Sequence, residues 1–221
     1  MTADDSRRPW LVGVTGASGT PYAAALLRGL LDAGEAVDLM LSQAARLTLL
    51  DETGHSVRDR HWRTDVAAWI GRDGPAMRYW SASDLAAGPS SGSYPTKGMI
   101  IAPATTSSVA AIATGATRNL IHRAADVTLK ERRRLVLLLR ETPFRLSTLD
   151  NLRSLAAEGA VVMPACPAFY AGARDIDQLV DFMAGRVLDL CGVHHDLYRR
   201  WTGTLGPAAG TELWEAGAGR S

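Results

Sequence analysis

The sequence of 221 residues contains few cysteines and no long apolar run. Two cysteines, Cys166 and Cys191, are too few for a disulfide framework, so a reducing cytoplasm fits the composition best. No apolar run approaches the roughly 20 residues of a membrane-spanning helix, and the first ten residues lack the apolar stretch of a secretory signal. The sequence therefore predicts a cytoplasmic protein without a membrane partner.

Charge of either sign is not in excess either. The formal net charge is +1, which gives no reason to expect a nucleic-acid partner. His194 and His195 have no further residues at metal-ligand spacing, so no metal site is expected. A hydrophobic content of 47% is enough for one sizeable core. We predict a single domain over residues 10–202, with disordered tails at 1–9 and 203–221.

Short apolar runs alternate with helical patterns along most of the chain. The expected strands are residues 10–14, 36–42, 98–103, 134–139 and 160–164, and the expected helices are 20–34, 43–54, 107–115, 146–159 and 175–192. The polar segment 55–97 is expected to hold short elements and a long loop. Near-continuous apolar strands that alternate with helices predict an α/β fold with a parallel sheet covered on both faces.

The end of the first strand carries a glycine-rich turn, with Gly13, Gly16 and Gly19 spaced by two residues each. This spacing matches neither the dinucleotide fingerprint nor a P-loop, which also needs a lysine. Amide groups and the Ser18 hydroxyl at a helix start suit an anion, although an ordinary turn with Ser18 as the helix cap explains the same residues. Ser42, where a dinucleotide enzyme would prefer an acidic residue, weakens the NAD hypothesis.

The other strand ends carry polar residues that should meet the glycine turn, because ligands bind beyond the carboxyl ends of parallel strands. Residues 103–108 ("PATTSS") offer hydroxyls at a helix start, or simply cap that helix. In "RETP", Arg140 is suited to clamp an anion, and Glu141 either moves a proton or pairs with Arg140. The basic segment 123–134 is typical of a solvated helix end. We interpret Cys166 as a small buried filler and not as a nucleophile.

Several of these motifs together resemble the UbiX-type flavin prenyltransferases. They are "TGASGTPYAAALL", "LSQAARLTLLDET", "SSGS", "NLIHRAADVTLKERRRLVLLLRETPF", "GAVVMPACPAFY" and "QLVDFMAGRVLD", in this order from about Trp10 to Trp201. The resemblance implies a Rossmann-like, flavodoxin-like three-layer αβα sandwich. It also implies an enzyme that joins dimethylallyl phosphate to N5 and C6 of reduced FMN without a metal. The prenylated FMN would serve a UbiD-type decarboxylase, and the enzyme would be a dodecamer with sites at subunit interfaces.

The resemblance also implies roles for individual residues. The residues that would bind FMN are Gly16, Ala17, Ser18, Ser42, Thr105, Thr106, Ser107, Ser108 and Arg140. Tyr170 and Arg186 would hold the dimethylallyl phosphate, helped by Lys130 and Arg123. Glu52 and Trp201 match positions that neighbouring subunits contribute to the site, and Glu141 matches the acidic residue that handles protons.

Two departures and two alternatives stay open. Relatives commonly have "PCS" where this chain has Pro103-Ala104-Thr105, and many have proline in place of Arg134. An FMN-dependent cysteine decarboxylase of the epidermin or phosphopantothenoylcysteine type has a "PASANT" motif similar to "PATTSS", but its asparagine is missing here. A flavin carrier without catalysis is the non-enzymatic alternative. The residues do not distinguish dimethylallyl phosphate from the pyrophosphate.

Overall fold

The chain was analysed as a computed structural model that describes residues 8–201 and 203. Most residues of the two predicted tails therefore lie outside the described part. Pro9, the last residue of the predicted N-terminal tail, is buried, and its carbonyl accepts a hydrogen bond from the Lys97 amide at 3.0 Å. Pro9 of the predicted N-terminal tail is therefore part of the packed fold.

Six parallel strands form one sheet in the order β3-β2-β1-β4-β5-β6. Their bounds are β1 Trp10–Val14, β2 Val37–Leu41, β3 Met77–Ser81, β4 Gly98–Ala104, β5 Arg134–Leu139 and β6 Val161–Pro164. The chain adds strands outward from β1 in both directions. It first adds β2 and β3 on one side, and then β4, β5 and β6 on the other side. This is the doubly wound order of a Rossmann-like, flavodoxin-like fold, and it confirms the predicted parallel sheet.

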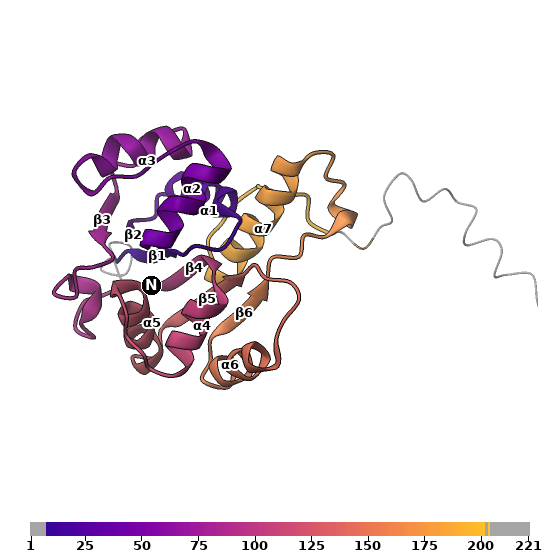
Figure 1. Cartoon of the computed structure of the whole chain (residues 1–221). Coiled ribbons are helices and arrows are strands. Elements are labelled where there is room, and N and C mark those ends of the chain that lie inside the picture. Colours follow the sequence, from indigo (N-terminus) through magenta and orange to yellow (C-terminus); the bar gives the residue numbers. More distant parts are fainter. Residues whose placement is uncertain (1–7, 202, 204–221) are drawn as a thin grey trace, which may run out of the picture.

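Helices cover both faces of the sheet (Figure 1). The helices are α1 Thr20–Asp32, α2 Gln43–Thr53, α3 Trp62–Ile70, α4 Thr106–Ala113, α5 Leu120–Lys130, α6 Leu146–Ala157 and α7 Ile176–Cys191. Residues of α1, α2, α3 and α7 share one core with the sheet, whereas those of α4, α5 and α6 share the other. The predicted three-layer αβα sandwich is therefore confirmed.

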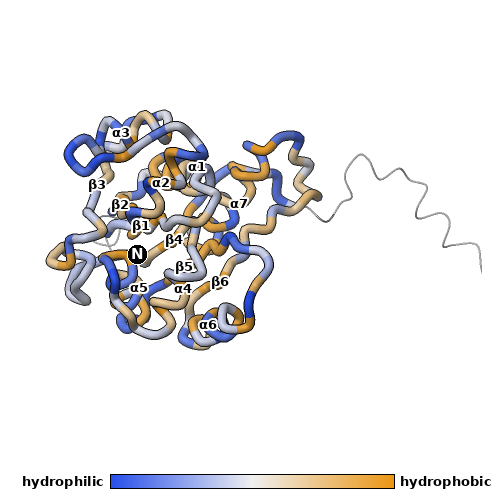
Figure 2. Tube along the Cα trace, viewed as in Figure 1, coloured by the Kyte–Doolittle hydropathy of each residue, from blue (hydrophilic) through white to orange (hydrophobic). Residues whose placement is uncertain are grey.

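The central strands are buried on both faces, which explains their continuous apolar sequences. Every residue of β1 and of β4 is buried. Along β1, Val12 and Val14 face the core that contains α1, and Leu11 faces the other core. Figure 2 shows the resulting concentration of hydrophobic residues in the middle of the molecule. Each such side chain stabilises the fold by roughly 1.5–3 kcal/mol on burial.

The polar segment 55–97 contains two elements whose bounds the sequence analysis did not predict, α3 and β3. Two short 3-10 helices, η2 Asp59–His61 and η3 Gly88–Ser90, lie on either side of them. The strand β3 is at the edge of the sheet, and only Met77 among its residues is buried. An edge strand of this kind lacks the apolar run that marks a central strand. Among the described residues, no helix is both long and apolar enough to cross a membrane.

Candidate functional site

The strand order reverses between β1 and β4, and the glycine turn and residues 105–108 follow these two strands directly. A crevice beyond the carboxyl ends at such a point is the usual ligand site of this fold. Thr15 ties the two loops together. Its Oγ1 donates to the Pro103 carbonyl at 2.7 Å and accepts from the Thr105 amide at 2.8 Å. The two predicted flavin-binding segments are therefore neighbours.

The glycine turn also packs against the start of α2. A Cβ on Gly16 would lie 2.5 Å from the Cβ of Ala44, so only glycine allows this close approach. Ser42 caps α2, because its Oγ accepts from the Ala45 amide at 3.0 Å. Since the hydroxyl oxygen is the acceptor there, the hydroxyl hydrogen stays available for a ligand. The α2 N-terminus and the glycine turn thus form one anion-compatible corner.

A second helix N-terminus, that of α4, borders the same crevice. Thr105 is its N-cap and accepts from the Ser108 amide at 3.1 Å. The Thr105 hydroxyl also lies 2.9 Å from the Ser108 hydroxyl, which is 3.1 Å from Nε2 of His122. Burial lowers the pKa of His122, and the nearby Arg118 lowers it further, so this imidazole is neutral at pH 7. The sequence analysis missed His122 because its contact to Ser108 depends on how α5 packs beside α4.

The end of β5 brings Arg140 to the glycine turn. Arg140 follows β5, and its Nε donates to the Ser18 carbonyl at 3.1 Å. Glu141 is exposed, and its Oε1 accepts from the Thr142 amide at 3.0 Å. The alternative in which Glu141 pairs with Arg140 is therefore not what the structure has. Arg140 contacts the glycine turn, and the Glu141 side chain is exposed beside it at the end of the same strand.

Glu52, at the end of α2, occupies the N-terminus of α1 within its own chain. Its carboxylate accepts from the amides of Gly19 and Thr20 at 2.8–3.1 Å and from the Thr20 hydroxyl at 2.6 Å. Burial would raise the pKa of Glu52, but hydrogen bonds from Thr20, Ser18 and the two amides outweigh it and lower the pKa.

The alternative in which Ser18 only caps α1 is therefore not what the structure has. The N-cap of α1 is Gly19 and not Ser18. Gly19 has no side chain that could accept from the amides of the helix. Glu52 contacts the glycine turn of its own chain because α2 runs back alongside α1, and its expected contribution to a neighbouring subunit's site stays a prediction. An anionic ligand consequently has the N-termini of α2 and α4 open to it, while Glu52 holds that of α1.

The three predicted substrate residues gather on α7 and the loops beside it. The rings of Tyr170 and Trp201 meet edge to face at 5.8 Å, and Tyr170 packs in the same way on Phe182 at 6.1 Å. Arg186, on α7, donates to the Tyr198 hydroxyl at 3.4 Å. Trp201 has a contact within its own chain, and its expected role across an interface stays a prediction. The chain turns back after Gly192, at the end of α7, and this turn brings Trp201 against Tyr170 of the same chain.

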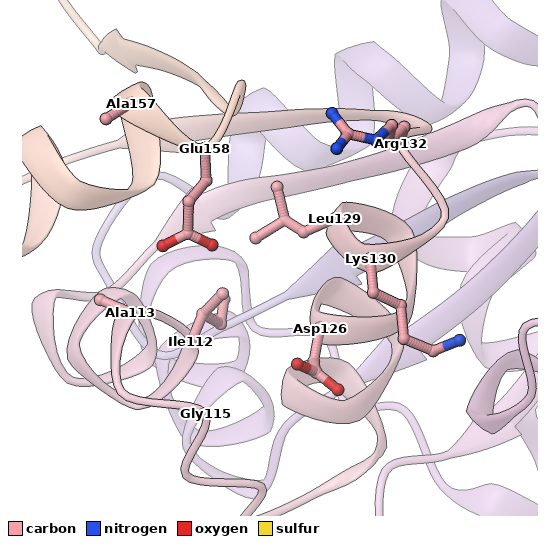
Figure 3. A pocket seen from close by; sticks show the side chains of 9 residues that line it. All are labelled: Ile112, Ala113, Gly115, Asp126, Leu129, Lys130, Arg132, Ala157 and Glu158. Carbon is pink, nitrogen blue, oxygen red and sulfur yellow. The ribbon is translucent and has the colours of Figure 1, made fainter.

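Arg123 and Lys130, the two predicted basic residues, contact other parts of the chain than the crevice. Arg123 donates to the Ser90 carbonyl at 3.1 Å and pairs with Asp126 at 2.7 Å. Lys130 ends α5 and pairs with Glu131. It also lines a hollow of about 470 Å³, together with Asp126 and Glu158 (Figure 3). In that view the Lys130 side chain extends away from Glu158. Within one chain, the structure does not bring these two cations to the glycine turn.

Two further expectations concern cysteine and metal chemistry. Cys166 is exposed, so its interpretation as a buried filler is wrong, because it follows β6 in a loop at the rim of the sheet. Within residues 8–201 and 203, no group of three or more His, Cys, Asp or Glu side chains is placed to hold a metal ion. The groups that face the crevice are amides, hydroxyls and one guanidinium, which suit phosphate and a polar ring edge.

Comparison with known proteins agrees with this geometry. The family described as Flavoprotein matches residues 1–188, so the chain is a flavoprotein by fold and by site. The chain is 62% identical to the flavin prenyltransferase UbiX of Streptomyces coelicolor, over 92% of this chain and 99% of that protein. It is 38% identical to the flavin prenyltransferase UbiX of Pseudomonas aeruginosa, over 86% of this chain and 92% of that protein. The chain belongs to the UbiX family of flavin prenyltransferases.

Solved structures give the same family. A structure of AnUbiX in complex with FMN and dimethylallyl pyrophosphate superimposes with a TM-score of 0.80 at 37% identity, covering 90% of this chain and 99% of that chain. A dodecameric FMN-dependent UbiX-like decarboxylase from Escherichia coli O157:H7 superimposes with a TM-score of 0.78 at 38% identity, covering 88% and 100%. The FMN-dependent cysteine decarboxylase TvaF, at 17% identity and a TM-score of 0.52, shares the fold alone.

Proposed function

We propose that this flavin prenyltransferase transfers the dimethylallyl group of dimethylallyl phosphate to N5 and C6 of reduced FMN. The allylic C–O bond, the N5–H and C6–H bonds of the flavin and the prenyl double bond are consumed, and a C–N, a C–C and a C–H bond form. Of the two protons that leave the flavin, one adds to the prenyl chain and the other leaves with the phosphate. A similar protein, AnUbiX, has been solved in complex with FMN and dimethylallyl pyrophosphate. The protein's contribution is to hold both substrates, meet the charge on the leaving phosphate and move the proton.

The residues at the crevice fit the phosphate and ribityl part of FMN. Gly16 lies against α2 in a cradle that any Cβ would fill, and the Ser42 hydroxyl keeps its hydrogen free to donate. The N-terminus of α4, capped by Thr105, adds a second partial positive charge. Arg140 is held at the turn by Ser18 and is suited to reach an FMN oxygen. Glu52, by filling the N-terminus of α1, directs the phosphate to these other groups.

Charge and proton transfer fall to the remaining residues. An allylic phosphate leaves easily only when its developing charge is met by fixed cations and hydrogen-bond donors. Arg186 and Tyr170 supply these from α7 and the loop after β6, with Trp201 packed on Tyr170. Glu141 is the exposed carboxylate at the crevice rim and takes the proton that ring closure releases.

We further propose that the working enzyme is a homo-oligomer, in which Arg123 and Lys130 of one copy complete the site of another. Both residues are bound away from the crevice of their own chain. The similar protein from Escherichia coli O157:H7 is dodecameric, and we propose the same assembly here. The product would pass to a UbiD-type decarboxylase. A cytoplasmic location fits the two free cysteines and a reduced flavin substrate.

The observation that carries the proposal is the convergence of Ser18, Ser42, Thr105 and Arg140 at one edge of the sheet, in a chain that is 62% identical to a UbiX enzyme over 92% of its length. The test is anaerobic incubation of the full-length protein with reduced FMN and dimethylallyl phosphate, followed by mass measurement of the flavin. We expect a flavin heavier by one five-carbon unit. Unaltered flavin would instead support a carrier, and carbon dioxide release from a C-terminal cysteine peptide would support a cysteine decarboxylase. A parallel reaction with the pyrophosphate identifies the preferred donor.

A further inference from the structure

Asp189, on α7, accepts hydrogen bonds from four different side chains. Its Oδ1 accepts from Nε2 of His195 at 3.1 Å and from Nη2 of Arg200 at 2.8 Å. Its Oδ2 accepts from the Tyr198 hydroxyl and from Nη1 of Arg186 at 3.3 Å. Only 20% of the side chain is exposed. Neither the sequence motifs nor the proposed reaction assigns a role to this carboxylate.

The Asp189 carboxylate is ionised at neutral pH. Burial would raise the pKa of Asp189, but the hydrogen bonds from Arg200, Tyr198 and His195 outweigh it and lower the pKa. A charged acceptor makes stronger hydrogen bonds than a neutral one, and four donors nearly exhaust its lone pairs. Asp189 is therefore a fixed anchor and not a group that exchanges protons with a substrate.

Asp189 holds Arg186 both directly and through the Tyr198 hydroxyl. Arg186 lies three residues before Asp189 on the same helix face, and its Nη1 reaches both the Asp189 carboxylate and the Tyr198 hydroxyl. Nearly half of the Arg186 side chain, 47%, remains exposed. The guanidinium is thus held through Nη1, and the exposed part of the side chain leaves further N–H donors for a phosphate.

The same carboxylate fixes the segment 193–201, which carries Trp201. A Cβ on Gly185 would lie 2.6 Å from the Tyr198 ring and 2.7 Å from the His195 ring, so both rings pack directly on the bare helix backbone. Tyr198 also packs on Phe182 at 4.8 Å, and Phe182 packs on Tyr170. Figure 1 shows α7 with this orange-to-yellow part of the chain at one side of the molecule. Asp189 therefore connects Arg186 with the Tyr170–Trp201 pair.

We infer that Asp189 is a positioning residue that sets the Arg186 guanidinium and the Tyr170–Trp201 pair for the phosphate of the prenyl donor. The inference rests on the proposed function, which assigns Arg186 to that phosphate. Asp189 itself need not touch the donor, because its four hydrogen-bond sites are already used by the protein.

The test compares Asp189→Asn with the wild type and with Asp177→Asn, which changes an exposed aspartate at the other end of α7. We expect kcat/KM for dimethylallyl phosphate to fall about 10²-fold in Asp189→Asn, the effect of a misplaced binding group. The Kd for FMN should stay as in the wild type, because no FMN-binding group belongs to the network. Asp177→Asn should leave both constants unchanged. Unchanged kcat/KM in Asp189→Asn, or an equal loss of FMN binding, overturns the inference.

A second background separates positioning from general stability. In an Arg186→Met protein, adding Asp189→Asn should lower kcat/KM by clearly less than 10²-fold, because the effect through Arg186 is already lost and only that through the Tyr170–Trp201 pair remains. A full additional 10²-fold loss there would show a merely structural role. If Asp189→Asn does not fold, Tyr198→Phe decides instead, since it keeps the ring and removes one hydroxyl shared by Asp189 and Arg186. Failure of the proposed function itself is recognised separately, because the wild-type protein would then make no prenylated flavin.

Discussion

Glu52 is the residue that most changes the picture of the glycine turn, and its charge is testable by pH. Its pKa in the folded protein is lowered by the α1 amides and hydroxyls, so its contribution to stability is complete above the unfolded pKa of about 4.3. We expect Glu52→Gln to lower the free energy of unfolding at pH 7 by about 1 kcal/mol. The difference from the wild type should shrink as pH falls through the folded pKa. Urea unfolding at several pH values measures it.

Glu158→Gln is the matched control for that experiment, because Glu158 is exposed and has only a long hydrogen bond of 3.4 Å to Ser154. Its effect should be small at every pH. A Glu52→Gln deficit that does not change between pH 7 and pH 3 would mean that the carboxylate charge at the helix terminus contributes nothing.

Glu141 is the residue on which the chemical step depends. Glu141→Gln keeps the size of the side chain and its hydrogen bond to the Thr142 amide, but removes the basic site. We expect turnover of reduced FMN with dimethylallyl phosphate to fall by about 10²–10⁴-fold, as for the loss of a general acid–base. The Kd for FMN should change little. Near-normal turnover would remove Glu141 from the mechanism, and lost FMN binding would make its role structural.

Residue types were predictable from the sequence wherever they follow a strand, but their partners were not. Ser42, Thr105 and Arg140 lie at the crevice as expected, because parallel strands place their carboxyl ends together. The bond from Glu52 to Thr20 spans 32 positions and depends on the angle between α1 and α2. No local pattern encodes such a distance. For the same reason, the four-donor environment of Asp189 was not visible in "RVLDL".

At the scale of elements, the close approach of the glycine turn after β1 to α2 should control flavin binding. Gly16→Ala would place a methyl group 2.5 Å from the Ala44 Cβ, so α2 must shift away from the turn. We expect a loss of stability of about 1–3 kcal/mol and weaker FMN binding, because Ser42 moves with α2. Flavin titration and urea unfolding measure the two effects. Adding Ala44→Gly should restore part of both, and no recovery in the double variant would place the cause elsewhere.

The elements themselves show how far periodicity reaches. All five predicted strands and five predicted helices occur, because a buried central strand needs a continuous apolar run and a surface helix an apolar stripe. In segment 55–97, the sequence pattern did not predict α3 or β3. Tyr79 in β3 bonds to Asp59 at 2.9 Å, and such polar contacts at the sheet edge leave no apolar pattern to detect. The basic segment 123–134 was interpreted as typical of a solvated helix end, whereas Arg123 and Arg133 in it donate to the carbonyls of Ser90 and Gly92.

At the scale of the whole molecule, the proposed shared site of Arg140 and Lys130 depends on the distance between the two residues. Arg140 follows β5 at the carboxyl edge of the sheet, and Lys130 precedes β5 at the opposite edge. The six residues of β5 span about 20 Å between them. A lysine side chain does not cover that distance. If both residues serve one reaction, they come from different copies, as in a closed assembly with repeated interfaces.

Mixing two inactive variants tests this arrangement directly. Lys130→Ala and Arg140→Ala should each be inactive as a homo-oligomer. The two variants are mixed in equal amounts, unfolded together and refolded. In randomly assembled oligomers each site then has about one chance in two of an intact Lys130 and one in two of an intact Arg140, so about a quarter of the sites have both. We expect turnover to return to about that fraction of the wild-type value. Light scattering confirms that oligomers have formed, and differently tagged variants confirm that they are mixed. Mixed oligomers that stay inactive would show that Lys130 and Arg140 do not complete a shared site.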